Sequence, residues 1–189
     1  SLVYGDTYME TFPTWTPDGK SLYFTRAQGY QKGMALDSIR YDLCRISFDA
    51  STEKIGAPEM VLQASSQQKS ISFPCVSPNG KYLMFTLSDY GNFSIWHPES
   101  DLYIMDLTTG TTKNLENVNS SDVDSYHTWS SSGHWFVFSS KRMDGLWARP
   151  YIAAFNPETG ETGKAFLLPQ KDPMFYDNYR SEEHTSELQ

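Results

Sequence analysis

The sequence predicts an all-β fold, a partial β-propeller of about three four-stranded antiparallel blades. Three observations carry this prediction. A tight-turn motif recurs three times, a short apolar run follows each copy, and a second strand-and-turn motif follows each run. Repeats of about 50 residues with four short strands each are typical of propeller blades. We expect the blades to cover about residues 10–63, 70–117 and 124–168.

The first motif predicts a hairpin at the start of each blade. Residues 13–20 read Pro-Thr-Trp-Thr-Pro-Asp-Gly-Lys, residues 74–81 read Pro-Cys-Val-Ser-Pro-Asn-Gly-Lys, and residues 127–134 read His-Thr-Trp-Ser-Ser-Ser-Gly-His. Proline presets the first corner of a type I turn, Asp or Asn tolerates the second, and glycine takes the left-handed position that follows. The third copy has Ser131-Ser132 instead of Pro-Asp, so we expect a looser turn there.

The remaining strands of each unit follow in order. The second strands are the aromatic and branched runs at residues 22–24, 82–85 and 135–138, which we expect to be buried on both faces. The third strands lie at residues 42–46, 102–106 and 152–156. In the second and third units the following turn ends in Gly110 and Gly160, and the fourth strands are at residues 60–62, 112–115 and 165–168.

Charge and composition exclude several classes of partner. The chain has 23 acidic and 15 basic residues and a formal net charge of −8, so it repels phosphate backbones and we expect no nucleic-acid partner. Its longest apolar runs have four or five residues, which is too short for insertion into a membrane. Cys44 and Cys75 lie in different blades, and we expect them to be unpaired.

Both ends of the chain differ from its repeated body. The chain begins with Ser1 instead of Met, and we expect it to be a piece of a longer protein. Residues 180–189 have no aromatic residue and resemble a translated sequencing adapter, so we expect a non-native or disordered tail after a propeller segment at residues 1–179. Because a ring usually needs about four to eight blades, the missing blades of the same chain are expected partners.

These motifs resemble one known repeat. Residues 15–24 and 77–86 are similar to the W-S-P-D-G-K-x-I-x-F core of the TolB-like, WD-related propeller repeat, and residues 101–110 resemble the strand and turn that follow this core. The second copy departs from the pattern by having Val76 in place of the tryptophan. The resemblance implies a location in the periplasm or cell envelope. It implies no single function, because such repeats occur in translocation proteins, peptidase propellers and polysaccharide-acting enzymes.

The candidate binding residues lie on or beside the long connections. In a four-stranded blade, the loops between strands two and three and the connections between blades emerge on one face, which is a usual place for binding residues. Aromatic and Arg side chains are typical of interface hot spots. Trp96 and Trp147 either contact a partner or pack between blades. The candidates are Tyr90, Trp96, His97, Asp122, Asp124, His127, Arg142, Asp144, Trp147 and Arg149.

The sequence assigns no catalytic residue, metal site or cofactor. No G-x-S-x-G, H-E-x-x-H or C-x-x-C motif occurs. His127 begins an innermost strand, where it would either face the channel and join a metal or acid–base site or serve as a hydrogen-bonded structural histidine. Residues 117–124 contain oxygen ligands that calcium uses, but their spacing favours a solvated acidic loop.

Two function classes stay open. The first is a non-catalytic, TolB-like binding propeller of the cell envelope that holds a protein or a glycan through its long-loop face or channel. The second is the propeller segment of an enzyme, either the gating domain of a serine peptidase or a metal-dependent polysaccharide lyase. A downstream hydrolase domain would favour the peptidase. Convergence of His97, His127 and acidic residues at ligand distance would favour the lyase.

Overall fold

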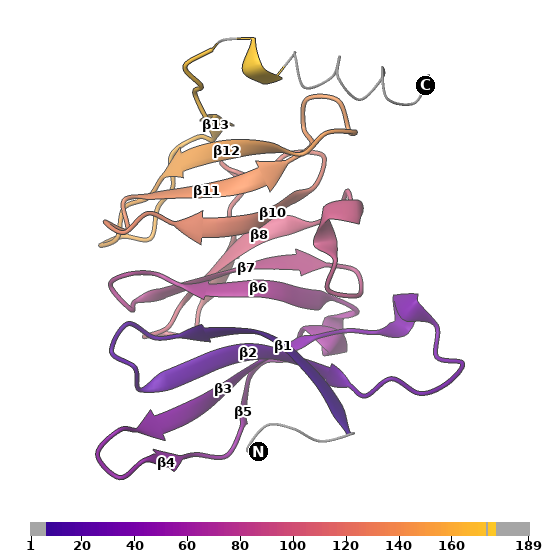
Figure 1. Ribbon diagram of the computed structural model, residues 1–189, viewed down its shortest axis with the longest axis vertical. Coiled ribbons are helices and arrows are strands. Elements are labelled where there is room, and N and C mark those ends of the chain that lie inside the picture. Colours follow the sequence, from indigo (N-terminus) through magenta and orange to yellow (C-terminus); the bar gives the residue numbers. More distant parts are fainter. Residues whose placement is uncertain (1–6, 173, 177–189) are drawn as a thin grey trace.

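The chain forms a row of three antiparallel sheets in a computed structural model (Figure 1). The structure describes residues 7–172 and 174–176, so the expected tail at 180–189 lies outside the described residues. Each sheet is built from consecutive strands, and the chain completes one sheet before it starts the next. The expected all-β architecture of about three blades is confirmed.

Blade 1 has one strand more than the sequence predicts. Its strands are β1 (Tyr8–Trp15), β2 (Ser21–Gln28), β3 (Asp42–Asp49), β4 (Lys54–Ile55) and β5 (Glu59–Leu62). The expected fourth strand is β5, which pairs with β3. The additional strand arises because β3 extends to Asp49, and the chain then turns back so that β4 pairs with the last two residues of β3.

Blades 2 and 3 have four strands each, paired in sequence order. Blade 2 contains β6 (Ser70–Val76), β7 (Tyr82–Ser88), β8 (Asp101–Asp106) and β9 (Thr112–Asn114). Blade 3 contains β10 (Asp124–Trp129), β11 (Trp135–Ser140), β12 (Arg149–Ala154) and β13 (Phe166–Leu167). Short 3-10 helices lie in the connections: η1 (Leu36–Ser38), η2 (Ala64–Gln67) and η3 (Ser94–Trp96).

The first hairpin of each blade has the predicted turn. Gly19, Gly80 and Gly133 have φ values of 69°, 73° and 69°, which is the left-handed conformation that glycine tolerates. Each donates its N–H to the carbonyl three residues earlier, at 2.9, 2.8 and 2.9 Å. The expected loosening of the third turn therefore does not reach the backbone. The loosening is limited to the side chains. The hydroxyl oxygens of Ser130 and Ser132 are 3.1 Å apart, whereas the corresponding side-chain hydrogen bonds of the first two turns measure 2.6 and 2.7 Å.

The hydrophobic cores lie between neighbouring blades. Alternate residues of β7 enter different cores, so Leu83 and Phe85 pack toward blade 1 and Met84 packs toward blade 3. The expected burial on both faces is confirmed for β7. It is incomplete in β11, where Trp135 is 40% exposed and Val137 is only partly buried. Trp129 of β10 packs against the core shared with blade 2 and donates its indole N–H to the Cys75 carbonyl at 3.1 Å.

Each innermost strand contains a bulge that the sequence did not predict. The pairing register shifts between Thr11 and Thr14 in β1, and β6 and β10 shift at the equivalent places. At these bulges Phe12, Phe73 and Tyr126 have φ values of 54°, 52° and 52°. We call these three residues the bulge aromatics. Their rings contact one another across the blades, with centroids 4.2 Å apart for Phe12 and Phe73 and 4.3 Å apart for Phe73 and Tyr126.

Two expectations about the chain as a whole can be compared with the structure. Cys44 and Cys75 are both free thiols, as expected. Burial raises the pKa of each thiol, so neither has the character of an activated nucleophile.

Within the described residues, no helix has the length and apolar character needed to cross a bilayer.

Candidate functional site

The long connections gather at one end of the sheets, which we call the loop face. In Figure 1 the β2–β3, β7–β8 and β11–β12 connections all lie on the right-hand side, whereas the tight hairpin turns lie on the left. The connections that carry η2 and η3 belong to this same end. Sequence reasoning placed the candidate binding residues on or beside the long connections, so the loop face is the candidate site.

Large apolar side chains are exposed on the loops of blades 2 and 3. Trp96 is 71% exposed and Leu146 is 72% exposed. The ammonium of Lys141 lies 4.3 Å from the centre of the Trp96 ring and so connects the two loops. The alternative in which Trp96 packs between blades is therefore wrong. We call the exposed set the apolar loop residues: Phe93, Trp96, Met143, Leu146 and Trp147.

Asp124 supports these loops from inside the protein. Its side chain is fully buried and forms an ion pair of 2.6 Å with Arg142. The other carboxylate oxygen accepts hydrogen bonds from the backbone N–H and hydroxyl of Ser120, at 2.6 and 2.9 Å. Arg142 also donates to the Val118 carbonyl and lies 4.4 Å from the centre of the Tyr151 ring. The expectation that Asp124 binds a partner is corrected, because its oxygens are occupied by its own chain.

A second ion pair shapes the β11–β12 loop. Arg149, which is buried, donates to Asp144 at 2.9 Å. The other oxygen of Asp144 accepts the backbone N–H groups of Leu146 and Trp147, each at 3.0 Å. These contacts fix the backbone that presents the two exposed side chains. Arg149 therefore positions the loop from the protein interior and does not reach the surface.

His97 and Tyr90 form a local contact in the β7–β8 loop. The two rings pack edge to face with centroids 4.4 Å apart. The Nδ1 atom of His97 lies 3.1 Å from Oε1 of Glu99. His97 is buried against its own loop, while Tyr90 stays partly exposed. Asp122 likewise acts locally, because its carboxylate accepts the N–H of Val123 at 2.7 Å.

His127 lies between blades 2 and 3 and is only 7% exposed. Burial lowers the pKa of its imidazole to about 4, while the nearby backbone of Met84 and Phe73 acts weakly in the opposite direction. Neither ring nitrogen has a hydrogen-bond partner of ordinary geometry. The channel-facing interpretation is therefore corrected, because the side chain is packed between blades. The structural interpretation holds for its burial, with only the backbone of Met84 and Phe73 near the ring nitrogens.

The histidines and carboxylates do not converge. Across the part of the chain that the structure describes, no group of three His, Cys, Asp or Glu side chains is placed to hold a metal ion. His97 is engaged with Glu99 in its loop, and His127 is enclosed between blades. The convergence that would favour the lyase alternative is thus missing from the described residues.

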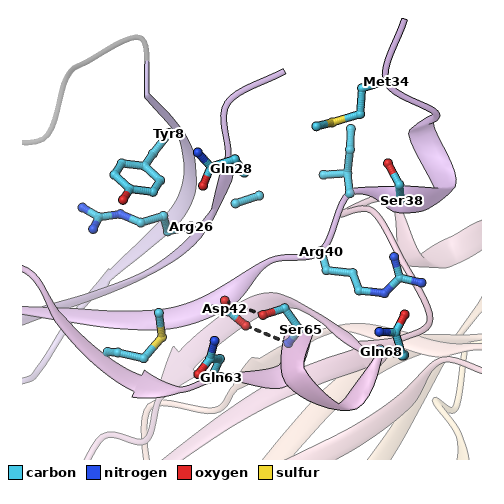
Figure 2. Close-up of a pocket in the computed structure, with 13 residues that line it drawn as sticks. Tyr8, Arg26, Gln28, Met34, Ser38, Arg40, Asp42, Gln63, Ser65 and Gln68 are labelled. Atoms are coloured by element: carbon cyan, nitrogen blue, oxygen red, sulfur yellow. Dashed lines mark hydrogen bonds between the residues drawn. The ribbon is translucent and has the colours of Figure 1, made fainter. Parts of the chain in front are cut away.

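The loop face of blade 1 holds a pocket of about 540 Å³ that the sequence did not predict (Figure 2). Its residues come from β1, β2, the η1 loop, the start of β3, and the segment around η2, so no single stretch of sequence reveals it. In Figure 2, Tyr8 and Arg26 lie at one side and Arg40 and Gln68 at the other. Its charged and amide side chains are Arg26, Gln28, Arg40, Asp42, Gln63 and Gln68.

One cation of this pocket has no carboxylate partner within the described chain. Arg26 is neutralised by Glu10 at 2.6 Å. Asp42 accepts the backbone N–H and the hydroxyl of Ser65 at 2.8 and 2.9 Å, as Figure 2 shows. Arg40 donates only to a backbone carbonyl of its own loop, at 3.2 Å, and its Nε atom is buried without a partner.

Comparison with known proteins identifies the fold. No family model and no curated protein matches this sequence. An oligogalacturonate lyase in complex with manganese matches 88% of this chain and 44% of its own, with 12% identity and a TM-score of 0.58. A puromycin-hydrolyzing peptidase of Mycobacterium tuberculosis matches 87% of this chain and 24% of its own, with 14% identity and a TM-score of 0.57. The Dos1 propeller matches 85% of this chain and 37% of its own, with 16% identity and a TM-score of 0.51.

The chain spans less than half the length of each of these three structures. At such low identity the likeness concerns the fold alone. The sheet order, the repeated hairpins and these matches together identify the chain as about three blades of a β-propeller.

Proposed function

We propose that this chain is a non-catalytic binding segment of a TolB-like propeller of the cell envelope, and that it holds a protein partner on its loop face. The observation that carries the proposal is the exposure of the apolar loop residues on neighbouring loops of blades 2 and 3. Exposed apolar side chains grouped on one face of a protein are typical of interaction sites, and Trp is prominent among interface hot spots.

The charges around these residues support a protein over a polyanion. Arg142 and Arg149 are each neutralised by a carboxylate of the same blade, and the whole chain carries −8. Met143 and Leu146 offer aliphatic surface without a hydrogen-bonding group, which suits an apolar protein surface better than the hydroxyls of a glycan. A partner with a large apolar anchor therefore fits this surface best.

We also propose that further blades of the same chain cover blade 1. Trp129 in blade 3 is packed against blade 2, whereas Trp15, at the same place of the repeat in blade 1, is 52% exposed. A neighbouring blade would bury Trp15 in the way that blade 2 buries Trp129. The exposure of Trp15 therefore supports a longer propeller.

The test places a photo-crosslinking amino acid on the loop face in the cells that make the protein. The crosslinker replaces Leu146, and a matched control replaces Ile55, an exposed apolar residue of β4 at the opposite end of the sheets. We expect one discrete crosslinked protein at position 146, no such product at position 55, and loss of the product on Trp96→Ala. Equal crosslinking at both positions, or none at 146, would refute the proposal.

The enzyme alternatives are decided by the complete reading frame. The fold is shared with a peptidase and a lyase, so the fold does not discriminate between binding and gating. A downstream α/β domain with a G-x-S-x-G motif would make this segment the gate of a peptidase. Additional propeller repeats without such a domain would leave the binding proposal in place.

A further inference from the structure

We propose that the pocket on the loop face of blade 1 binds a carboxylated sugar, with Arg40 as the anchor for the carboxylate. This site is separate from the apolar loop residues of blades 2 and 3 and would act whether or not they bind a protein. Its volume of about 540 Å³ lies in the range of small-molecule sites, which runs from about 300 to 1,000 Å³. One or two sugar rings fit such a volume.

Arg40 supplies the charge that selects a carboxylate. A guanidinium presents a planar fork of N–H donors that matches the two oxygens of a carboxylate. Arg40 uses one donor on the Asp37 carbonyl, and its buried Nε donor is unsatisfied. The Nη2 donors of Arg40 make no hydrogen bond to any described residue, so they are the donors that a ligand carboxylate would use. Arg26 is not available for this role, because Glu10 already neutralises it.

The other polar groups suit hydroxyls. The side-chain amides of Gln28, Gln63 and Gln68 line the pocket and make no hydrogen bond to any residue that the structure describes. Each amide can donate and accept, which is what a sugar hydroxyl requires of its partner. Met34 and Met60 add apolar surface on which the C–H groups of a ring can pack.

The pocket favours a single negative charge over a doubly charged phosphate. The carboxylates of Asp42 and Glu10 stand near the two arginines, and the chain is acidic overall. With Arg26 neutralised, Arg40 is the one lining cation left to balance a ligand among the described residues. A monoanion with several hydroxyls, which is the chemistry of a uronic acid, meets these conditions.

Calorimetric titration of this chain with galacturonate and glucuronate tests the site, with galactose, glucose and acetate as matched probes. We expect saturable uronate binding and at least about tenfold weaker binding of the neutral sugars and of acetate. Arg40→Gln should weaken uronate binding by about tenfold or more and leave the weak binding of neutral sugars unchanged. Arg45→Gln is the matched control, because Arg45 is outside the pocket and pairs with Glu59.

A second variant separates loss of the site from loss of the fold. Gln68 has a φ of 59°, a conformation that Asn tolerates, so Gln68→Asn shortens the amide arm without straining the backbone. It should weaken uronate binding several-fold while urea unfolding stays unchanged. The proposal is overturned if no uronate binds below about 10 mM, if galactose binds as well as galacturonate, or if Arg40→Gln has no effect.

A neighbouring blade is the competing occupant of this pocket. The same titration on the complete reading frame distinguishes the two. Retained uronate binding, still weakened by Arg40→Gln, supports a ligand site in the whole protein. Loss of binding in the complete protein would mean that a blade fills the pocket and would overturn the proposal.

Discussion

Lowering the pH should weaken the packing between blades 2 and 3 through a single residue, His127. Its imidazole is buried without a hydrogen-bond partner of ordinary geometry, and burial lowers its pKa to about 4. In the unfolded chain the pKa returns to about 6.5. Above pH 6.5 both states are neutral, so the residue contributes no pH dependence. As the pH falls below this value, His127 becomes protonated in the unfolded chain while it stays neutral in the folded chain. The free energy of unfolding therefore decreases.

The size of the effect follows from the two pKa values. Between pH 7 and pH 5 the loss should be about 2 kcal/mol, and it should reach about 3 kcal/mol near pH 4, below which it levels off. His127→Leu keeps a side chain of similar volume and removes the proton site, so this variant should lack that part of the pH dependence. Acidic residues titrate equally in both proteins and cancel in the comparison.

The assay is urea unfolding followed by tryptophan fluorescence between pH 7.5 and pH 4.5. The stability of His127→Leu relative to the unmodified chain should rise by about 2 kcal/mol from pH 7 to pH 5. His134→Gln is the control, because His134 is exposed, and it should follow the unmodified chain throughout. Parallel pH profiles for the His127→Leu variant and the unmodified chain would show that the imidazole is not buried in the neutral form, and the reasoning would be refuted.

Five further substitutions test the turns, the buried ion pair and the bulge aromatics by urea unfolding at pH 7. Glu53 has a φ of 53° at the position of the repeat where Gly110 has a φ of 73°. Glu53→Gly should therefore stabilise the chain by up to about 1 kcal/mol, and Gly110→Ala should destabilise it by a similar amount. A destabilising effect of Glu53→Gly would contradict this expectation. Asp124→Asn leaves Arg142 without its partner and should cost about 3 kcal/mol, whereas a cost below about 1 kcal/mol would mean that the pair is replaceable by water. Phe73→Gly should be less destabilising than Phe73→Ala, because glycine accepts the φ of 52° and alanine does not; the reverse order would show that strain is absent.

The repeat was predictable because its turns depend on local chemistry. The Pro-Asx-Gly sequence specifies a hairpin within a few residues, and the apolar runs beside it are long enough to specify buried strands. The short strand β4 was not predictable, since Lys54 and Ile55 have no strand pattern of their own and pair only because β3 extends to Asp49. Its existence depends on the length of a neighbouring strand, which the pattern alone does not fix.

The site was less predictable because burial depends on distant parts of the chain. In the sequence, Asp124 is flanked by residues typical of an exposed acidic loop. In the structure it is buried, because Arg142 from the β11–β12 loop packs against it and pairs with it. The pocket of blade 1 was missed for a related reason. Arg40, Gln63 and Gln68 belong to separate segments, and none of them forms a motif. Trp96 and Trp147 were chosen because aromatic residues stand out in long loops; the structure shows both side chains exposed, and their role in binding stays a prediction.

The bulge aromatics show that the structural repeat is more regular than the sequence motif. An aromatic residue stands immediately before each copy of the first motif, as Phe12, Phe73 and Tyr126. The sequence shows this aromatic position, but it gives no sign of a positive φ, because bulky residues rarely adopt one. Such a conformation costs about 1 to 3 kcal/mol at each residue.

Part of this cost is offset by a contact that exists only between blades. Each bulge turns its ring toward the ring of the neighbouring blade, and aromatic pairs at these separations contribute about 0.5 to 1.5 kcal/mol beyond the area that they bury. Phe73 contacts a ring on both sides, whereas Phe12 and Tyr126 each contact one within the described residues. The strain of the middle blade is therefore compensated twice and that of the outer blades once. An isolated blade would keep the strain and lose the compensation, so the bulges make the stability of each blade depend on its neighbours.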